Sequence, residues 1–143
     1  MFEIIRIDNK NNNFISDFLN NAGAALKKFR YYEKRSIDVI SNHIVTCVLM
    51  QNGEAPVGYG HLDKDGNDIW LGIAVNDNYI GKGFGKLIIS YLLDFAIKEK
   101  INLIKLTVDV NNQKAISLYE KVGFIIETMY SEKVYLMKKI INA

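Results

Sequence analysis

The stretch that decides the fold is VNDNYIGKGFGKLI, residues 75–88, where glycines at alternate positions precede a strongly helical pattern. These are Gly81, Gly83 and Gly85, with Lys82 inside the run and Lys86 directly after it. The first N–H groups of a helix have no intrahelical acceptor, and the helix dipole places partial positive charge there. Glycines permit left-handed backbone angles and let an anion approach the backbone closely. The two lysines stand at the start of the helix, where acidic residues are usual. The stretch predicts an anion site; the plainer interpretation is a glycine-rich turn with solvated lysines.

Two familiar phosphate-binding motifs do not fit this stretch. The dinucleotide fingerprint G-x-G-x-x-G requires glycine at the position of Lys86, and it follows the first strand of its fold, whereas several strands precede this loop. The nucleotide loop G-x-x-x-x-G-K-[ST] fails because Leu87 follows Lys86 and Ile80 replaces the first glycine. We therefore expect the anion to be neither NAD nor a nucleoside triphosphate.

The rest of the chain alternates strand and helix patterns around this loop. Strand patterns cover residues 2–7, 43–51, 57–63, 69–75, 103–110, 124–130 and 134–139, and helical patterns cover 14–23, two short segments within 24–42, the residues after the loop, and 112–123. The helix after the loop should bury one face containing Leu87, Ile88, Tyr91, Leu92 and Phe95. We predict one α+β domain, residues 1–143, with a mixed, mostly antiparallel, twisted sheet of about six to seven strands flanked by about four helices.

Composition limits the classes of function. The 143 residues are 49% hydrophobic and 24% charged, and the net charge of +2 favours neither nucleic acid nor an anionic membrane as a partner. No apolar stretch is long enough to span a bilayer, and the N-terminus has no signal-peptide pattern. The single Cys47 cannot form an internal disulfide, so a cytoplasmic location is expected. We interpret this cysteine as a buried strand residue rather than a nucleophile.

Two segments in this order carry a family resemblance. The loop at 75–88 resembles the coenzyme A pyrophosphate loop Q/R-x-x-G-x-G/A of the GCN5-related N-acetyltransferase superfamily. The segment LTVDVNNQKAISLYEKVGF, residues 106–124, resembles that family's later element N-x-x-A-x-x-L-Y-x-x-x-G-F. With the strands before and the hairpin after, the resemblance covers nearly the whole chain. One position departs from the pattern, because Ile80 stands where the loop usually has Gln or Arg.

The resemblance implies acetyl-CoA as cofactor and acetyl transfer as activity. It implies pyrophosphate on the loop, pantetheine paired with the strand backbone of GIAV (72–75), and a hydrogen bond from the pantetheine arm to Asn112. The implied cofactor residues are Ile73, Ala74, Val75, Gly81, Lys82, Gly83, Phe84, Gly85, Lys86, Asn112 and Tyr119. No metal ion is expected.

Acetyl transfer to an amine needs a neutral nucleophile, stabilisation of the developing oxyanion, and a proton for the departing thiolate. The resemblance makes Tyr119 the general acid, with a core aromatic as the alternative interpretation, and backbone N–H groups of 73–75 would polarise the thioester carbonyl. Some family members carry a glutamate where this chain has Ile69, so no base carries over. The candidates are Asp68, His61, Tyr59, Glu33 and, less favoured, His43; His61 has a suitable unperturbed pKa near 6.5. A water chain without a single base stays open.

The segment FRYYEKRS, residues 29–36, lies where similar enzymes line the acceptor site. Its aromatic and charged residues, with His61, form the predicted acceptor pocket: Phe29, Arg30, Tyr31, Glu33, Arg35 and His61. An arginine there would pair with an anionic group. We expect a small-molecule amine, with amino sugars as one class; a protein or peptide amine and a non-catalytic acyl-CoA sensor are the alternatives. Either a monomer or a homodimer is compatible with the sequence.

Overall fold

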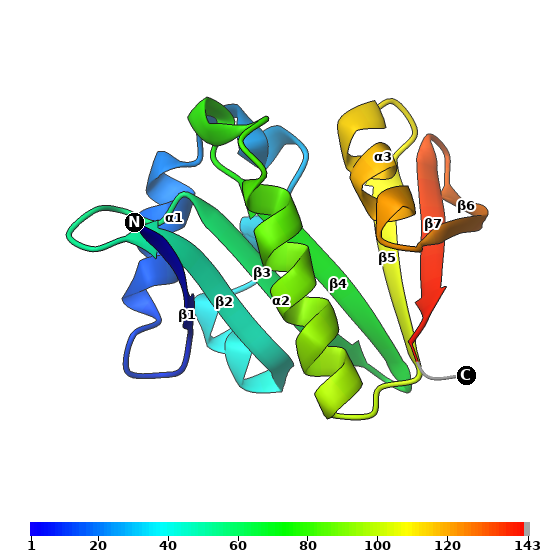
Figure 1. Ribbon diagram of the computed structural model, residues 1–143, viewed down its shortest axis with the longest axis horizontal. Helices are drawn as coiled ribbons and strands as arrows, with labels where there is room; N and C mark the ends of the chain where they lie inside the picture. The colour runs from blue at the N-terminus through cyan, green and yellow to red at the C-terminus, as the bar shows by residue number, and fades with distance from the viewer. Residues whose placement is uncertain (142–143) are drawn as a thin grey trace.

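The computed structural model describes residues 1–141, which build one seven-stranded sheet (Figure 1). The strands are β1 (Phe2–Arg6), β2 (His43–Gln51), β3 (Gly58–Asp65), β4 (Asp68–Val75), β5 (Leu103–Asp109), β6 (Ile125–Ser131) and β7 (Val134–Ile140), in the spatial order β1-β2-β3-β4-β5-β7-β6. The helices are α1 (Asn13–Asn21), α2 (Phe84–Lys98) and α3 (Gln113–Lys121), with short 3₁₀ helices η1 (Gly23–Lys27), η2 (Tyr31–Glu33), η3 (Ile37–Asn42) and η4 (Asp77–Tyr79). The predicted α+β class with a mostly antiparallel sheet is confirmed.

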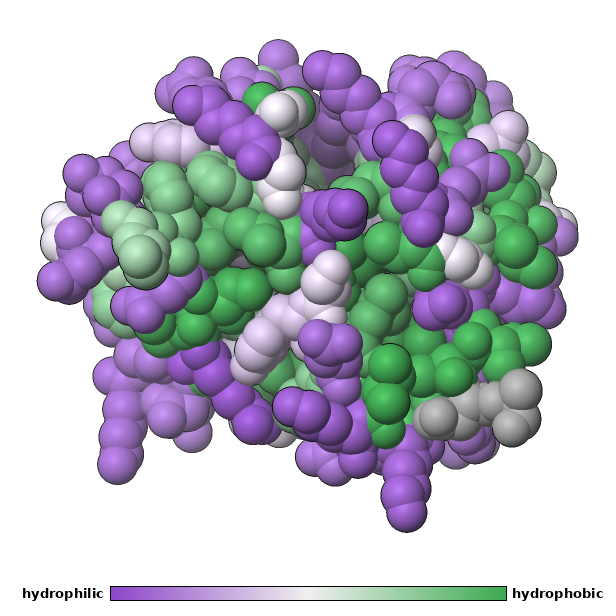
Figure 2. All heavy atoms as spheres, in the orientation of Figure 1, coloured by the Kyte–Doolittle hydropathy of each residue, from purple (hydrophilic) through white to green (hydrophobic). Residues whose placement is uncertain are grey.

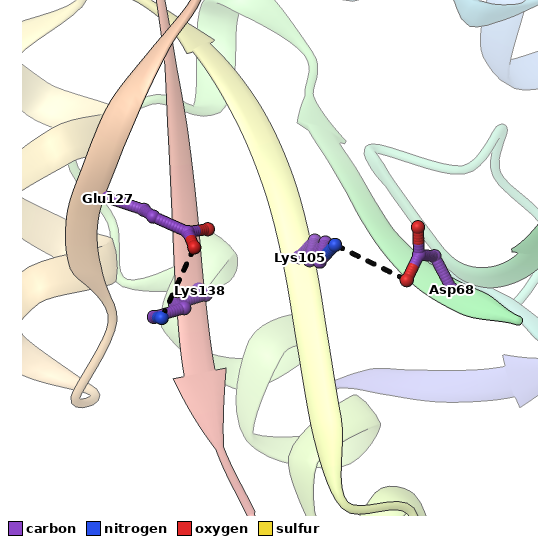
Figure 3. A network of polar contacts seen from close by, with 4 residues as sticks. All are labelled: Asp68, Lys105, Glu127 and Lys138. Carbon is purple, nitrogen blue, oxygen red and sulfur yellow. Dashed lines mark hydrogen bonds and ion pairs between the residues drawn. The ribbon is translucent and has the colours of Figure 1, made fainter.

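The sheet is antiparallel except at one junction, where β4 and β5 run parallel. That junction has a single register pair, Trp70 with Lys105. The Nζ of Lys105 also lies 3.3 Å from Oδ1 of Asp68, so an ion pair reinforces the same end (Figure 3). Beyond this pair the two strands diverge toward their carboxyl ends, leaving that side of the β4 backbone, residues 71–75, without a strand partner.

One face of the sheet is covered by α2, which crosses β2, β3 and β4 (Figure 1). A Cβ at Gly58 or Gly60 of β3 would lie within 2.6 Å of Ile88, so these glycines let α2 approach closely. The buried stripe of α2 is Ile88, Ile89, Leu92 and Ala96. The prediction that Leu87 faces the core is wrong: its side chain is 51% exposed, because the close approach at β3 rotates the stripe toward Ile89 and Ala96.

The opposite face is covered by α1 and the 3₁₀ segments that follow it. Ile15 and Phe18 of α1 pack there on Val48 and Tyr59 of the sheet, and Phe29, Tyr32 and Ile37 lie along the edge of this second core. The short helices predicted within 24–42 are therefore present as 3₁₀ turns, and Ser36 caps η3 by accepting a hydrogen bond from the Asp38 N–H. These turns bring the FRYYEKR segment over β3.

Three further features complete the description of the fold. Cys47 lies fully buried in β2, and burial raises the pKa of its thiol to about 12, which removes it as a nucleophile. Within residues 1–141, no helix combines the length and apolarity that crossing a membrane requires. At the far edge, β6 is exposed throughout and pairs with β7 as an antiparallel strand, and an ion pair between Glu127 and Lys138, 3.2 Å apart, joins the same two strands (Figure 3).

Candidate active site

The glycine loop adopts the backbone that an anion site needs. Gly81 and Gly83 have φ of +85° and +82°, and a Cβ built at either glycine would meet nothing within 4 Å. Gly83 is the N-cap of α2; no side chain caps that end, and the first turn contains no acid. The leading amides of α2 therefore face open space, as a phosphate site requires. Gly85 has a different role: it lies inside α2, where a Cβ would come within 3.1 Å of Leu118 in α3.

A cleft of about 1180 Å³ begins at this loop and continues through the divergence of β4 and β5. Ile73, Ala74 and Val75 of β4 line it on one side, and Asn112 and Tyr119 line it on the other. Lysines also line the cleft, namely Lys28, Lys86, Lys114 and Lys121. Figure 2 shows hydrophilic residues gathered along the edge of the molecule where α2 and α3 begin. This cationic edge suits a ligand with several phosphate charges.

Tyr119 is a buried residue of α3 that lines the cleft. Its ring packs edge-on against Phe124, with centroids 5.9 Å apart, and only 6% of the residue is exposed. Burial raises the pKa of its phenol above the usual 10. The Tyr119 hydroxyl forms no hydrogen bond within residues 1–141. Because no fully buried side-chain oxygen in those residues lacks a partner, this hydroxyl oxygen keeps some accessible surface. The neutral hydroxyl is therefore available to a group bound in the cleft.

His61 lies on the face of β3 opposite α2 and lines the same cleft. The residue is 2% exposed, and its Nδ1 lies 2.7 Å from the Tyr59 hydroxyl. Its Nε2 lies over Gly72 of β4, where a Cβ would be only 2.6 Å away. The rings of Tyr31 and His43 stand 4.4 and 4.5 Å from it, centroid to centroid. Burial, followed by the neighbouring His43 and Arg35, holds the pKa of His61 well below 6.5, so the ring is neutral at physiological pH.

A second polar chain forms the wall beside His61. The Tyr31 hydroxyl donates to Oδ2 of Asp63 at 2.8 Å and lies 2.7 Å from Nε2 of His43. Nδ1 of His43 in turn lies 2.7 Å from the Thr46 hydroxyl. Because Tyr31 gives its only proton to the carboxylate, its oxygen accepts from Nε2–H of His43, and Nδ1 accepts from Thr46. Each group has a partner, so this chain acts as a clamp that holds η2 over β3.

The predicted acceptor residues are brought together, with one exception. Phe29, Arg30, Tyr31, Arg35 and His61 all line the cleft. Arg35 stacks on the Tyr31 ring at 4.3 Å and donates from Nη1 to the Tyr31 carbonyl at 2.9 Å.

Glu33 is exposed on η2 and lies outside the cleft lining, so it is not placed to act as a base. Among the predicted cofactor residues, Lys82 is not part of the cleft lining, and its ammonium lies over the ring of Tyr79, which does line the cleft. Asp68 is paired with Lys105 outside the lining.

Sequence reasoning missed several cleft residues. Asp63, Asp65, Trp70, Thr107 and Tyr130 also line the cleft. The alternation of Tyr59, His61 and Asp63 along one strand was the available signal, because a period of two places all three side chains on one face. Within the described residues, no group of three or more His, Cys, Asp or Glu side chains is arranged to hold a metal ion.

Comparisons with known proteins identify the fold. Residues 13–124 match the family described as Acetyltransferase (GNAT) family. An acetyltransferase of the GNAT family from Streptococcus pneumoniae superposes with a TM-score of 0.80 at 25% identity, covering 99% of this chain and 100% of the other. No curated protein sequence matches the chain significantly.

Two further solved structures are similar in fold. The ribosomal-protein-S18-alanine N-acetyltransferase from Escherichia coli superposes with a TM-score of 0.75 at 20% sequence identity, covering 100% of this chain and 96% of the other. The spermidine N-acetyltransferase from Vibrio cholerae, in complex with CoA and spermine, superposes with a TM-score of 0.75 at 22% sequence identity, covering 97% of this chain and 95% of the other.

Proposed function

Because this chain belongs to the acetyltransferase (GNAT) family, we propose that it transfers an acetyl group directly to the primary amine of a small molecule. Acetyl-CoA is the cofactor. The observation that carries the proposal is that one continuous cleft contains both the glycine loop and the predicted acceptor residues around His61. We call the latter part of the cleft, lined by Phe29, Arg30, Tyr31, Arg35 and His61, the His61 pocket. Direct transfer requires both reactants in one space, with the amine against the thioester.

The residues of this chain fit the cofactor. The uncapped start of α2, with open space above Gly81 and Gly83, would hold the pyrophosphate. The unpaired backbone of β4 at 71–75 would hold the pantetheine arm in strand fashion, with Asn112 on the other side of the cleft. When bound, acetyl-CoA supplies the activated acetyl group as a thioester.

The chain's own groups supply the proton chemistry. Tyr119 would donate to the departing sulfur; burial disfavours both the phenolate and the thiolate, so the phenol remains a usable donor beside the sulfur. His61 is neutral and lines the cleft. Its Nε2 has no hydrogen-bond partner within residues 1–141, although no fully buried side-chain nitrogen there lacks one; Nε2 is therefore accessible and would accept a proton from the amine. Backbone N–H groups of β4 would polarise the acetyl carbonyl.

Aromatic side chains packed against His61 favour a small acceptor. Phe29 and Tyr31 lie against His61, with ring centroids 6.2 and 4.4 Å away, so the segment 29–35 covers the imidazole on that side. Arg30 and Arg35 would meet an anionic group of the acceptor, and Asp63 would meet its ammonium group before deprotonation. Amino sugars and similar small polar amines combine these features. The single buried Cys47 supports a reducing compartment, and we place the protein in the cytoplasm.

A thiol-release assay with acetyl-CoA and a panel of amino sugars, polyamines, amino acids and peptides tests the proposal. We expect turnover with small amines and little with peptides. Peptide turnover alone would replace the proposed acceptor with a protein amine. Binding of acetyl-CoA without turnover across the panel would favour an acyl-CoA sensor.

A further inference from the structure

Two tyrosines extend from His61 away from the cleft. The hydroxyl of Tyr59, a residue with no exposed surface, lies 2.7 Å from Nδ1 of His61. The hydroxyl of Tyr32 lies 2.6 Å from that of Tyr59. Tyr32 belongs to η2, is partly exposed and does not line the cleft. The three groups form an unbroken hydrogen-bonded chain from the cleft at Nε2 to a partly exposed residue outside it.

This chain has two proton arrangements. In the first, Nδ1–H of His61 donates to Tyr59, Tyr59 donates to Tyr32, and Nε2 presents a lone pair to the cleft. In the second, Tyr32 donates to Tyr59, Tyr59 donates to Nδ1, and Nε2 carries the proton. Conversion of the first into the second takes up one proton at Nε2 and releases one at the Tyr32 hydroxyl. The imidazole is neutral at both ends of the conversion.

Burial explains why such a device is needed. Several groups face His61: Tyr59 on its own strand, His43 on β2, and Phe29, Tyr31 and Arg35 of the segment 29–35 that lies over β3. Asp63, on the same strand, already accepts a hydrogen bond from Tyr31. Burial, His43 and Arg35 all disfavour a charged imidazole, so a base that held its proton as imidazolium would be weak here. A base that passes a proton onward avoids that charge.

We propose that His61, Tyr59 and Tyr32 form a proton relay that accepts the proton of the acceptor amine at Nε2 and releases a proton to water at Tyr32. The inference rests on the proposed base role of His61. As the bond forms between the amine nitrogen and the acetyl carbon, the N–H proton moves to Nε2, Nδ1–H moves to Tyr59, and the Tyr59 proton moves to Tyr32. Tyr32 gives its own proton to water, while the carbon–sulfur bond breaks and Tyr119 protonates the sulfur. After the products leave, Tyr119 takes a proton back from water, and the relay returns to its first arrangement when Tyr32 takes up a proton and Nε2 of His61 gives one to water. Tyr59 and Tyr32 are positioning residues, since neither touches the acceptor.

The imidazole ¹⁵N NMR spectrum tests the resting arrangement without any substrate. The chain has two histidines, so only two imidazole rings contribute. We expect the neutral Nδ1–H tautomer for His61 at pH 7.5. We expect the opposite tautomer, Nε2–H, for His43, whose partners Tyr31 and Thr46 fix it and which serves as the internal control. An Nε2–H tautomer for His61 would overturn the relay, because no lone pair would face the cleft.

Kinetics test the release step. Tyr32→Phe keeps the ring contacts with Tyr31 and Tyr59 but removes the last hydroxyl. We expect kcat to fall about tenfold with unchanged acetyl-CoA affinity, within the range of acid–base effects. A curved proton inventory of kcat in mixed H₂O and D₂O should become linear, because fewer protons move together. Tyr91→Phe, on α2 and outside the cleft, is the control for loss of a hydroxyl.

The outcomes separate this inference from the proposed function. His61→Gln should lower kcat at least as much as Tyr32→Phe. If His61→Gln impairs turnover while Tyr32→Phe retains wild-type kcat and a curved inventory, His61 acts without a relay and the inference fails. If His61→Gln turns over normally, the base assignment within the proposed function fails, and the relay fails with it.

Discussion

Replacement of Gly72 by alanine should damage the His61 pocket specifically. Gly72 pairs with His61 across β3 and β4, and an added Cβ would lie 2.6 Å from Nε2 and 2.8 Å from Cε1 of the imidazole. Ordinary van der Waals contact begins near 3.4 Å, so the ring must retreat by about 0.8 Å. The rings of Tyr31 and His43 block a retreat on the covered side.

The expected cost follows from these contacts. Overpacking of a filled site costs about 1–3 kcal/mol, and a weakened bond to Tyr59 adds about 0.5–1.5 kcal/mol. We expect the free energy of unfolding to fall by about 2–4 kcal/mol. Gly72 lies in the β4 backbone that would hold the pantetheine arm, but its added Cβ would meet the His61 ring rather than the free backbone edge of the strand, so kcat should fall more than acetyl-CoA affinity.

Urea denaturation, calorimetric titration with acetyl-CoA and steady-state kinetics measure the three effects. Gly60→Ala is the matched control, because its Cβ would meet Ile88 at 2.5 Å on the opposite face of the sheet. That variant should lose comparable stability but keep normal turnover at temperatures where it stays folded. In a His61→Ala background, Gly72→Ala should cost under about 1 kcal/mol, since the clashing ring is absent. A Gly72→Ala protein with wild-type stability and an unchanged His61 ¹⁵N signal would refute the reasoning.

Four other predictions test the remainder of the site. Gly83→Val should weaken acetyl-CoA binding at least tenfold, about 1.4 kcal/mol by calorimetry, whereas Gly53→Val, with a nearly identical φ of +83° and equally open space, should not. Tyr119→Phe should lower kcat about 10- to 100-fold without changing acetyl-CoA affinity; normal kcat with rate-limiting chemistry would make it a packing residue. Arg35→Ala should raise the acceptor KM about tenfold and leave acetyl-CoA binding intact, and an unaltered KM would locate the anion contact elsewhere. Both histidines have folded-state pKa values below 6.5, so the unfolded chain binds more protons than the folded chain in acid. The contribution of the histidines to the free energy of unfolding, measured by urea denaturation, should be constant above about pH 6.5 and should fall below it by up to about 1.4 kcal/mol per pH unit for each histidine. His61→Gln should reduce that slope.

Much of the fold and half of the site could be predicted from local patterns. The left-handed angles at Gly81 and Gly83 follow from a turn that only glycine adopts readily, and the uncapped helix start follows from the residues around it. The antiparallel meander of β2, β3 and β4 follows from strand patterns separated by short turns. The burial of Leu87 was predicted wrongly. Helical periodicity indicates how wide the buried stripe of a helix is, but it does not determine how the helix is rotated about its axis against the sheet.

The sequence by itself determined the elements, their order and the glycine loop, because these depend on residues a few positions apart. Only the tertiary structure decided the acceptor pocket. Tyr32, Tyr59 and His61 are joined by hydroxyl contacts of 2.6–2.7 Å that depend on how a 3₁₀ segment folds over a strand about thirty residues later. The space for the imidazole depends on Gly72 in the next strand, through a register pair that no local pattern specifies. Proton positions and pKa values follow from burial and from these long-range partners, so they become readable only when the chain is folded.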